Sequence, residues 1–132
     1  MKSIYILFVA VLFSISVNAQ QHKIVWDVST SDTAEQRILF RQIANVLKES
    51  PDTKIEVVFF GGSIHGLVQG ASAFPDKVDE FNKKGVIFAA CNNSLRRFNI
   101  DPSKVLPGVV VVPVAILELT KKQEDGWSYI KL

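Results

Sequence analysis

Short apolar runs alternate with segments of helical periodicity along most of the chain. The apolar runs are of strand length, and two of them, at residues 86–90 and 109–112, contain no polar residue at all. Apolar strands separated by helices are typical of a parallel sheet that is covered on both faces. The strands are expected at residues 23–28, 55–60, 86–90, 109–112 and 127–131. The pattern therefore predicts a single α/β domain.

The longest helix is expected at residues 33–50, between the first two strands. Its apolar residues, among them Leu39 and Ile43, fall on one stripe, as in a helix that packs against a sheet. Asp32 precedes the helix and is a suitable N-cap residue. The other helical segments are expected at residues 75–84, up to residue 98, at 101–103 and at 114–123.

The first 19 residues have the features of a cleavable signal peptide. Lys2 supplies a positive charge, an apolar run follows at residues 4–17, and Val17-Asn18-Ala19 places small residues before the cleavage site. The apolar run is too short to span a bilayer comfortably. We therefore expect cleavage after Ala19, a periplasmic or secreted product, and no membrane span in the mature chain. Residues 20–132 are then expected to form the folded domain.

The charges of the chain are nearly balanced. The 15 Lys and Arg residues exceed the 13 Asp and Glu residues by two, and the net charge falls from +2 to +1 when Lys2 is removed. This balance argues against a nucleic-acid partner, because phosphate binding needs clustered cations on one face. One cysteine and two histidines do not have the spacing of metal ligands, so no metal site is expected.

The residues that follow the predicted strands are the candidates for function. In open parallel sheets, ligands bind where the carboxyl ends of the strands meet the first turns of helices. Asn92 and Asn93 are also expected to cap the short helix that follows them. The binding candidates at this edge of the sheet are Ser29, Gly61, Gly62, Ser63, Asn92 and Asn93.

Cys91 is the strongest candidate for a catalytic residue. It follows the third predicted strand, where the unpaired N–H groups of the next helix favour a thiolate. His65 is a second candidate, since it would act as a base or electrostatic partner if the two loops converge. The alternatives are a small cysteine packed in the core and a histidine on the surface. With a single cysteine the chain forms no internal disulfide, so the thiol is buried, paired between chains or kept for its chemistry.

Three segments resemble those of DsrE/DsrF-like proteins. They are GVIFAACNNSL at residues 85–95, LPGVVVVP at 106–113 and GWSYIK at 126–131. The resemblance covers essentially the whole mature chain and implies a three-layer, flavodoxin-like α/β domain with a mostly parallel five-stranded sheet. It also implies assembly into trimers or hexamers and, in sulfur-relay members, a cysteine that carries persulfide sulfur between proteins. Cys91 matches the position of that cysteine.

Two hypotheses of function follow. In the first, Cys91 accepts and relays sulfane sulfur without a cofactor, in a sulfurtransferase-like exchange with a donor or acceptor protein. In the second, the protein is a non-catalytic binding or assembly module with a small-ligand pocket at the carboxyl edge of the sheet. A full catalytic enzyme is least favoured, since only His65 offers a second catalytic group. A homo-oligomer is expected, because one small domain is not expected to bury the apolar residues of segment 64–74 alone.

Overall fold

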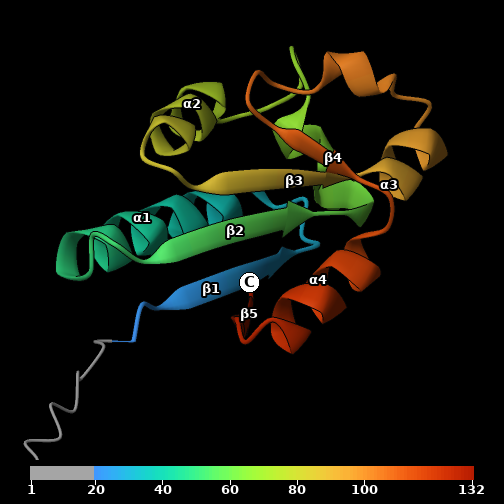
Figure 1. Ribbon diagram of the computed structural model, residues 1–132. Helices are drawn as coiled ribbons and strands as arrows, with labels where there is room; N and C mark the ends of the chain where they lie inside the picture. Colours follow the sequence, from blue (N-terminus) through green and yellow to red (C-terminus); the bar gives the residue numbers. More distant parts are fainter. Residues whose placement is uncertain (1–19) are drawn as a thin grey trace, which may run out of the picture.

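The computed structural model of the protein describes residues 20–132, so the predicted signal peptide lies outside the described residues. Five strands form one sheet in the spatial order β4-β3-β2-β1-β5, and all neighbouring strands are parallel (Figure 1). The strands are β1 (Lys23–Val28), β2 (Lys54–Phe59), β3 (Ile87–Cys91), β4 (Val110–Val112) and β5 (Ser128–Lys131). The predicted α/β class and parallel sheet are confirmed.

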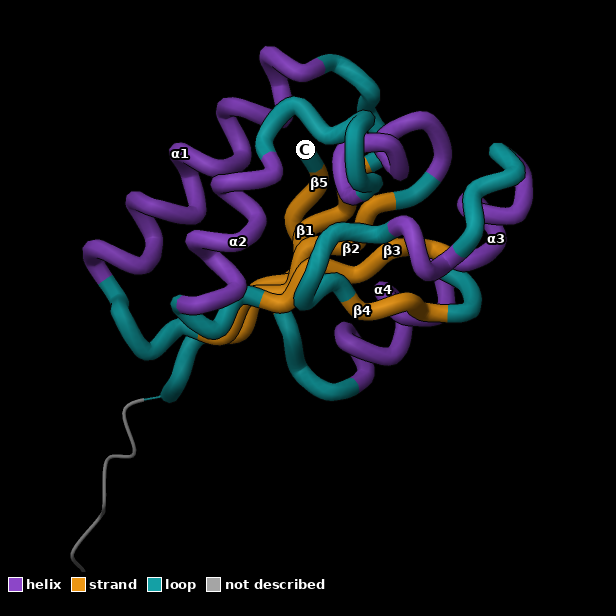
Figure 2. Tube along the Cα trace, turned by 90° about the horizontal axis from the view of Figure 1, so that it is seen from above, coloured by secondary structure: helices purple, strands orange, loops and turns teal. Residues whose placement is uncertain are grey.

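Helices form the two outer layers of the domain (Figure 2). The chain passes from β1 through β2 and β3 to β4 in one direction, and then returns across the sheet to β5. Because parallel crossovers are right-handed, this return places α4 on the face opposite to α1 and α2. The helices are α1 (Thr33–Glu49), α2 (Pro75–Lys83), α3 (Asn92–Arg97) and α4 (Ala115–Glu124), with 3₁₀ helices η1 (Gly61–Leu67) and η2 (Pro102–Lys104).

The predicted strands and α-helices form with only small displacements of their ends. Asp32 caps α1 as expected, because its carboxylate accepts a hydrogen bond of 2.7 Å from the backbone N–H of Ala34. The local residue pattern therefore determines where these elements begin and end.

The face of the sheet toward α1 and α2 holds most of the hydrophobic core. Trp26, Phe59 and Phe88 extend into this layer from three adjacent strands and are almost fully buried. They pack against the predicted stripe of α1, including Leu39 and Ile43. This layer is rich in aromatic side chains that are buried from solvent, which makes it the main source of the stability of the fold.

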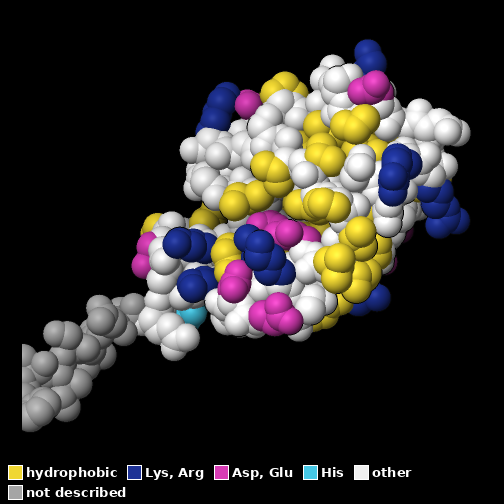
Figure 3. Space-filling model, turned by 45° about the vertical axis from the view of Figure 1, so that its right-hand side comes forward, with side chains coloured by type: hydrophobic (Ala, Val, Ile, Leu, Met, Phe, Trp, Pro, Cys, Tyr) yellow, Lys and Arg dark blue, Asp and Glu magenta, His cyan; other side chains and the backbone are white. Residues whose placement is uncertain are grey.

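The most exposed large apolar side chains lie on α4. In the segment 64–74, Ile64 and Leu67 are fully buried because η1 turns them into the core, whereas Ala71 and Ala73 are exposed and Phe74 is half-buried. The expectation that one domain cannot cover this segment is therefore wrong for its first half and stays a prediction for its second half. By contrast, Ile116 and Leu117 of α4 are 57% and 66% exposed, and apolar side chains gather on this side of the molecule (Figure 3). Within residues 20–132, no helix has both the length and the apolar character needed to cross a membrane.

Candidate functional site

Cys91 is the last residue of β3, at the carboxyl edge of the sheet. Side chains alternate along a strand, so Ala89 and Cys91 face α4 while Phe88 and Ala90 face α1 and α2. The thiol packs against the layer formed by α4 and is only 4% exposed. Cys91 thus lies at the predicted junction of a strand and a helix, and its side chain is closely packed there.

The N-terminus of α4 reaches Cys91 because β4 is the neighbour of β3 in the sheet. Val112, the last residue of β4, pairs with Cys91, and the chain passes from it into α4 within three residues. The backbone N–H of Ala115, the first residue of α4, donates to Cys91 Sγ at 3.4 Å. The unpaired N–H groups and the positive dipole end of this ten-residue helix thus lie beside the sulfur.

Two opposing effects act on the pKa of the Cys91 thiol. Burial raises the pKa, since a surrounding of low polarity disfavours the thiolate. The backbone N–H groups of Ala115, Ser94 and Asn93 lower the pKa, and the Ser94 hydroxyl adds to their effect. The donors prevail and hold the pKa of Cys91 below its ordinary value of 9.0. The site therefore favours a thiolate nucleophile.

The start of α3 differs from the prediction. Cys91 itself occupies the N-cap position, and no side chain forms a capping hydrogen bond there. The Asn93 side chain accepts from Arg96 on the following turn, so the expectation that Asn92 and Asn93 cap the helix is wrong. The physical reason is that the first N–H groups of α3 are directed at the thiol instead.

His65 lies away from this thiol environment. Its neighbours in η1, Ile64 and Leu67, belong to the core on the α1 side of the sheet, whereas Cys91 belongs to the cluster on the α4 side. The His65 ring meets Phe98 edge-on, with 5.0 Å between ring centroids, and lines a hollow of about 150 Å³. Within the described chain, no hydrogen bond joins His65 to Cys91, so a role for His65 as its base stays a prediction.

Two of the predicted binding residues hold the loops of this edge together. The buried Ser63 hydroxyl donates to the carbonyl of Val28 at 2.6 Å and accepts from the N–H of Phe60 at 3.1 Å. Gly61 adopts a left-handed φ of +60°, and its N–H donates to Ser94 Oγ at 2.8 Å. These bonds connect the ends of β1, β2 and α3. The other predicted binding residues at this edge, which are half-buried, are Ser29, Gly62 and Asn92.

The α4 face also carries two buried carboxylates that are not among the predicted site residues. Asp27 accepts a hydrogen bond of 2.6 Å from the Tyr129 hydroxyl, and Glu56 forms an ion pair of 2.7 Å with Lys122. Asp27 is 6% exposed and Glu56 is 2% exposed. A charged residue inside an apolar strand is the sequence signal that indicates such groups, because charges are rarely buried without a partner.

Burial and hydrogen bonding on this face shift the pKa values of Glu56 and Tyr129. Burial raises the pKa of Glu56, and the Lys122 ammonium only partly offsets this effect. The hydrogen bond to Asp27 raises the pKa of Tyr129 to about 12. One oxygen of Asp27 and one of Glu56 have no hydrogen-bond partner within the described residues. The α4 face is therefore the polar side of the sheet.

The chemistry that this site supports is that of one activated sulfur. Within residues 20–132, no three His, Cys, Asp or Glu side chains lie close enough together to hold a metal ion. The N–H donors around Cys91 stabilise a negative charge on its sulfur. A thiolate in such a position attacks an electrophilic sulfur or carbon atom.

The sequence profile of the DsrE/DsrF-like family matches residues 22–132. None of the curated proteins shows a significant match to the chain. Among solved structures, the protein of unknown function MTH1491 from Methanobacterium thermoautotrophicum is 28% identical to this chain, with a TM-score of 0.81. That match covers 85% of this chain and all of the archaeal one.

Two further structures share the fold at lower identity. The ychN protein from E. coli is 8% identical, with a TM-score of 0.72 over 86% of this chain and 100% of its own. The protein of unknown function BT1422 from Bacteroides thetaiotaomicron is 18% identical, with a TM-score of 0.69 over 83% of this chain and 94% of its own. Both likenesses extend over nearly the whole described domain and concern the fold alone.

Proposed function

The chain belongs to the DsrE/DsrF-like family, and on this premise we propose that it accepts and relays sulfane sulfur on Cys91. The Cys91 thiolate attacks the outer sulfur of a persulfide or polysulfide donor. A new S–S bond forms on Cys91, the S–S bond of the donor breaks, and the bonding electron pair leaves with the donor as a thiolate. An acceptor thiolate then takes the outer sulfur from Cys91 in the same manner. The exchange needs no external oxidant or cofactor.

The observation that carries this proposal is the hydrogen bond from Ala115 N–H to Cys91 Sγ at 3.4 Å. A cysteine that serves only as packing has no need of a helix N-terminus and of further donors from Asn93 and Ser94. The same donors stabilise a persulfide anion, because its charge is also carried on sulfur beside them.

Packing around the thiol restricts which donors react with it. At 4% exposure, Cys91 meets small sulfur species more easily than a folded protein partner. Access for a protein partner requires displacement of the side chains that pack around the thiol. We therefore expect inorganic polysulfide or a low-molecular-weight persulfide to be the faster donor.

The direct experiment is incubation of the mature protein, residues 20–132, with inorganic polysulfide, followed by intact mass measurement. The expected result is one added sulfur atom on the wild type and none on Cys91→Ser. Release of that sulfur by a small thiol, with return of the original mass, is expected as well. A wild type without an adduct, or an equal adduct on Cys91→Ser, contradicts the proposal.

A second function, a non-catalytic assembly module, is favoured by the packing of Cys91 among Val58, Ala89 and Val112. In that case the sulfur serves as a small apolar side chain. The rate of alkylation by iodoacetamide separates the two functions. A carrier thiol reacts in the native state at a lower pH than a free thiol does. A packing thiol reacts only after addition of denaturant.

We also propose that the chain is a homo-oligomer, as the family resemblance suggests, with a trimer or hexamer as the expected state. The exposed apolar residues of α4 and β4 support this proposal, since association would remove them from water. Light scattering of residues 20–132 should give a mass of three or six chains. A mass of one chain contradicts the proposal, and the variant Leu117→Lys should shift an oligomer toward smaller species.

Export is likewise a proposal, and it rests on the sequence of residues 1–19. Expression of the full chain in a bacterium should yield a product in the periplasm or medium whose first residue is Gln20. An intact N-terminus on a cytoplasmic product contradicts it. A full chain with Lys inserted into the apolar run should remain unprocessed.

A further inference from the structure

A groove between α1 and α2 is unrelated to the chemistry of Cys91. It lies on the outside of the α1 layer and encloses about 410 Å³, within the size range of small-molecule sites. Phe40, Phe74 and Phe81 line its apolar part. The Phe40 ring stands edge-on to Phe74 at 5.4 Å and stacks with Phe81 at 6.1 Å between centroids. Phe40 and Phe81 are almost fully buried and Phe74 is half-buried, so most of the aromatic surface that is open to the hollow belongs to Phe74.

The rim of this groove is positively charged. Arg37 and Arg41 contribute from α1, and Lys77 contributes from α2. Both arginines are exposed, and neither forms an ion pair within residues 20–132. The Arg37 guanidinium lies 5.8 Å from the centre of the Phe74 ring, so it already marks the boundary between the aromatic and the cationic parts.

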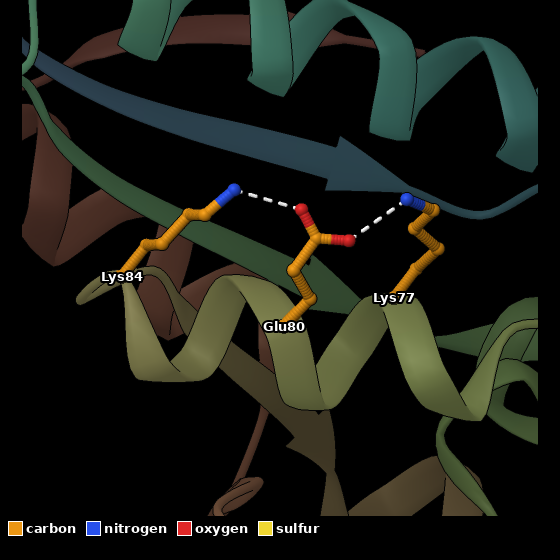
Figure 4. Close-up of polar contacts among 3 residues, drawn as sticks. All are labelled: Lys77, Glu80 and Lys84. Carbon is orange, nitrogen blue, oxygen red and sulfur yellow. Dashed lines mark hydrogen bonds and ion pairs between the residues drawn. The ribbon is translucent and has the colours of Figure 1, made fainter.

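The one carboxylate among the residues that line the groove, Glu80, is already paired with two lysines. Glu80 lies between Lys77 and Lys84 on α2 and accepts from their ammonium groups at 2.8 and 2.7 Å (Figure 4). Hydrogen bonds from these two lysines lower the pKa of Glu80 to about 2, so it stays ionised and paired. The negative charge of Glu80 is therefore balanced by these two lysines. The charges of Arg37 and Arg41 remain available to an incoming anion.

We infer that this groove binds a small planar aromatic carboxylate. The apolar body of such a ligand packs mainly on the Phe74 ring, which the buried Phe40 and Phe81 support, and its carboxylate reaches the Arg37 and Arg41 guanidinium groups. A neutral aromatic molecule would leave the arginines unpaired, and an aliphatic dicarboxylate would leave the rings uncovered. The groove thus selects a ligand with one apolar face and one negative charge. The site lies on the opposite layer from Cys91 and does not depend on sulfur transfer.

Titration of ¹⁵N-labelled residues 20–132 with 2-naphthoate, followed by NMR, tests this inference. Saturable shifts are expected in α1 and α2 around the groove. The double variant Arg37→Gln/Arg41→Gln should bind about tenfold more weakly, since each exposed rim charge contributes about threefold. The matched double variant Arg96→Gln/Arg97→Gln, on α3, should bind like the wild type. The neutral analogue 2-naphthamide should bind the wild type about tenfold more weakly than 2-naphthoate.

Other results would overturn the inference. These are shifts that do not saturate, shifts centred outside the groove, or equal binding of 2-naphthoate and 2-naphthamide. A blocked acidic peptide that contains Phe serves as a further probe. If this peptide saturates the groove while 2-naphthoate does not, the site is a peptide site and the small-molecule inference is wrong. Thermal unfolding of each variant shows that it is folded, so loss of binding is not loss of structure.

Discussion

The two faces of the sheet differ in kind. The face toward α1 and α2 buries aromatic residues such as Phe59 and Phe88 and contains the larger core cluster. The face toward α4 buries a thiol and two carboxylates, Cys91, Asp27 and Glu56, alongside small apolar residues. One sheet thus separates the groups that hold the fold together from the groups that are able to ionise.

Helix coverage explains this difference. On the first face, α1 and α2 together with η1 cover the core closely, so a buried charge there would be costly. On the second face, α4 is a single ten-residue helix whose ends lie close to solvent. Lys122 and Tyr129 extend from α4 and β5 to the buried carboxylates while keeping contact with water. Because a single helix covers the second face, ionisable side chains can be buried there beside partners that still contact water.

The largest expected effect is on stability, from the aromatic face. Phe88→Ala should lower the free energy of unfolding by about 3–5 kcal/mol, because it opens a cavity in a fully buried cluster. Cys91→Ala, on the same strand but the opposite face, should cost only about 1 kcal/mol. Urea denaturation of residues 20–132 measures both. Similar losses for the two variants would show that the faces do not differ in their contribution.

A smaller loss is expected when the Asp27 carboxylate loses its partner. Tyr129→Phe removes the hydroxyl that donates to Asp27 Oδ2, and should cost about 1–3 kcal/mol of unfolding free energy. The double variant Asp27→Leu/Tyr129→Phe should recover part of this loss, because it leaves no buried carboxylate behind. An unchanged midpoint in urea for Tyr129→Phe would show that Asp27 is solvated in the folded protein.

The smallest expected effect is on how the free energy of unfolding depends on pH. Burial raises the pKa of Glu56 above its ordinary value of 4.5, so the folded chain holds this proton more tightly than the unfolded chain. The contribution of Glu56 to stability is therefore present below pH 4.5 and declines as the pH rises through the folded pKa. Glu56→Gln does not titrate and should flatten the stability curve in this window.

Glu80→Gln is the control, because the pKa of Glu80 is shifted in the opposite direction to that of Glu56. Two lysines lower the pKa of Glu80 to about 2, so its contribution is present above pH 4.5 and is lost as the pH falls toward 2. The two variants should thus change the curve on opposite sides of pH 4.5. If Glu56→Gln has the same pH dependence as the wild type, Glu56 is not held in a dry environment.

The layers of the fold follow from local pattern. Runs such as residues 86–90 and the stripe containing Leu39 and Ile43 need only periodicity and capping to be recognised, and both elements form as predicted. The position of Cys91 at a strand end was also predictable, since a strand and a helix meet there. What local pattern does not contain is which helix faces which residue across the sheet.

Two features of the site depend on that missing information. The donor to Cys91 is Ala115, 24 residues away, and it reaches the sulfur only because β4 pairs with β3 and α4 crosses back over the sheet. His65 looked available as a partner because its loop also follows a strand, but η1 folds toward the other face. Cys91 faces α4 while η1 packs on the α1 side of the sheet, and this separation depends on tertiary packing rather than on sequence spacing.

The central claim is that the start of α4 stabilises a thiolate on Cys91, and the ultraviolet absorbance of the thiolate tests it most directly. The measurement needs no reagent to reach the buried sulfur, and subtraction of Cys91→Ala removes the absorbance of every other group. The account predicts a titration midpoint below 9.0 in residues 20–132, and a higher midpoint in Ser94→Ala, which removes one donor. A midpoint at or above 9.0 in the wild type would contradict it.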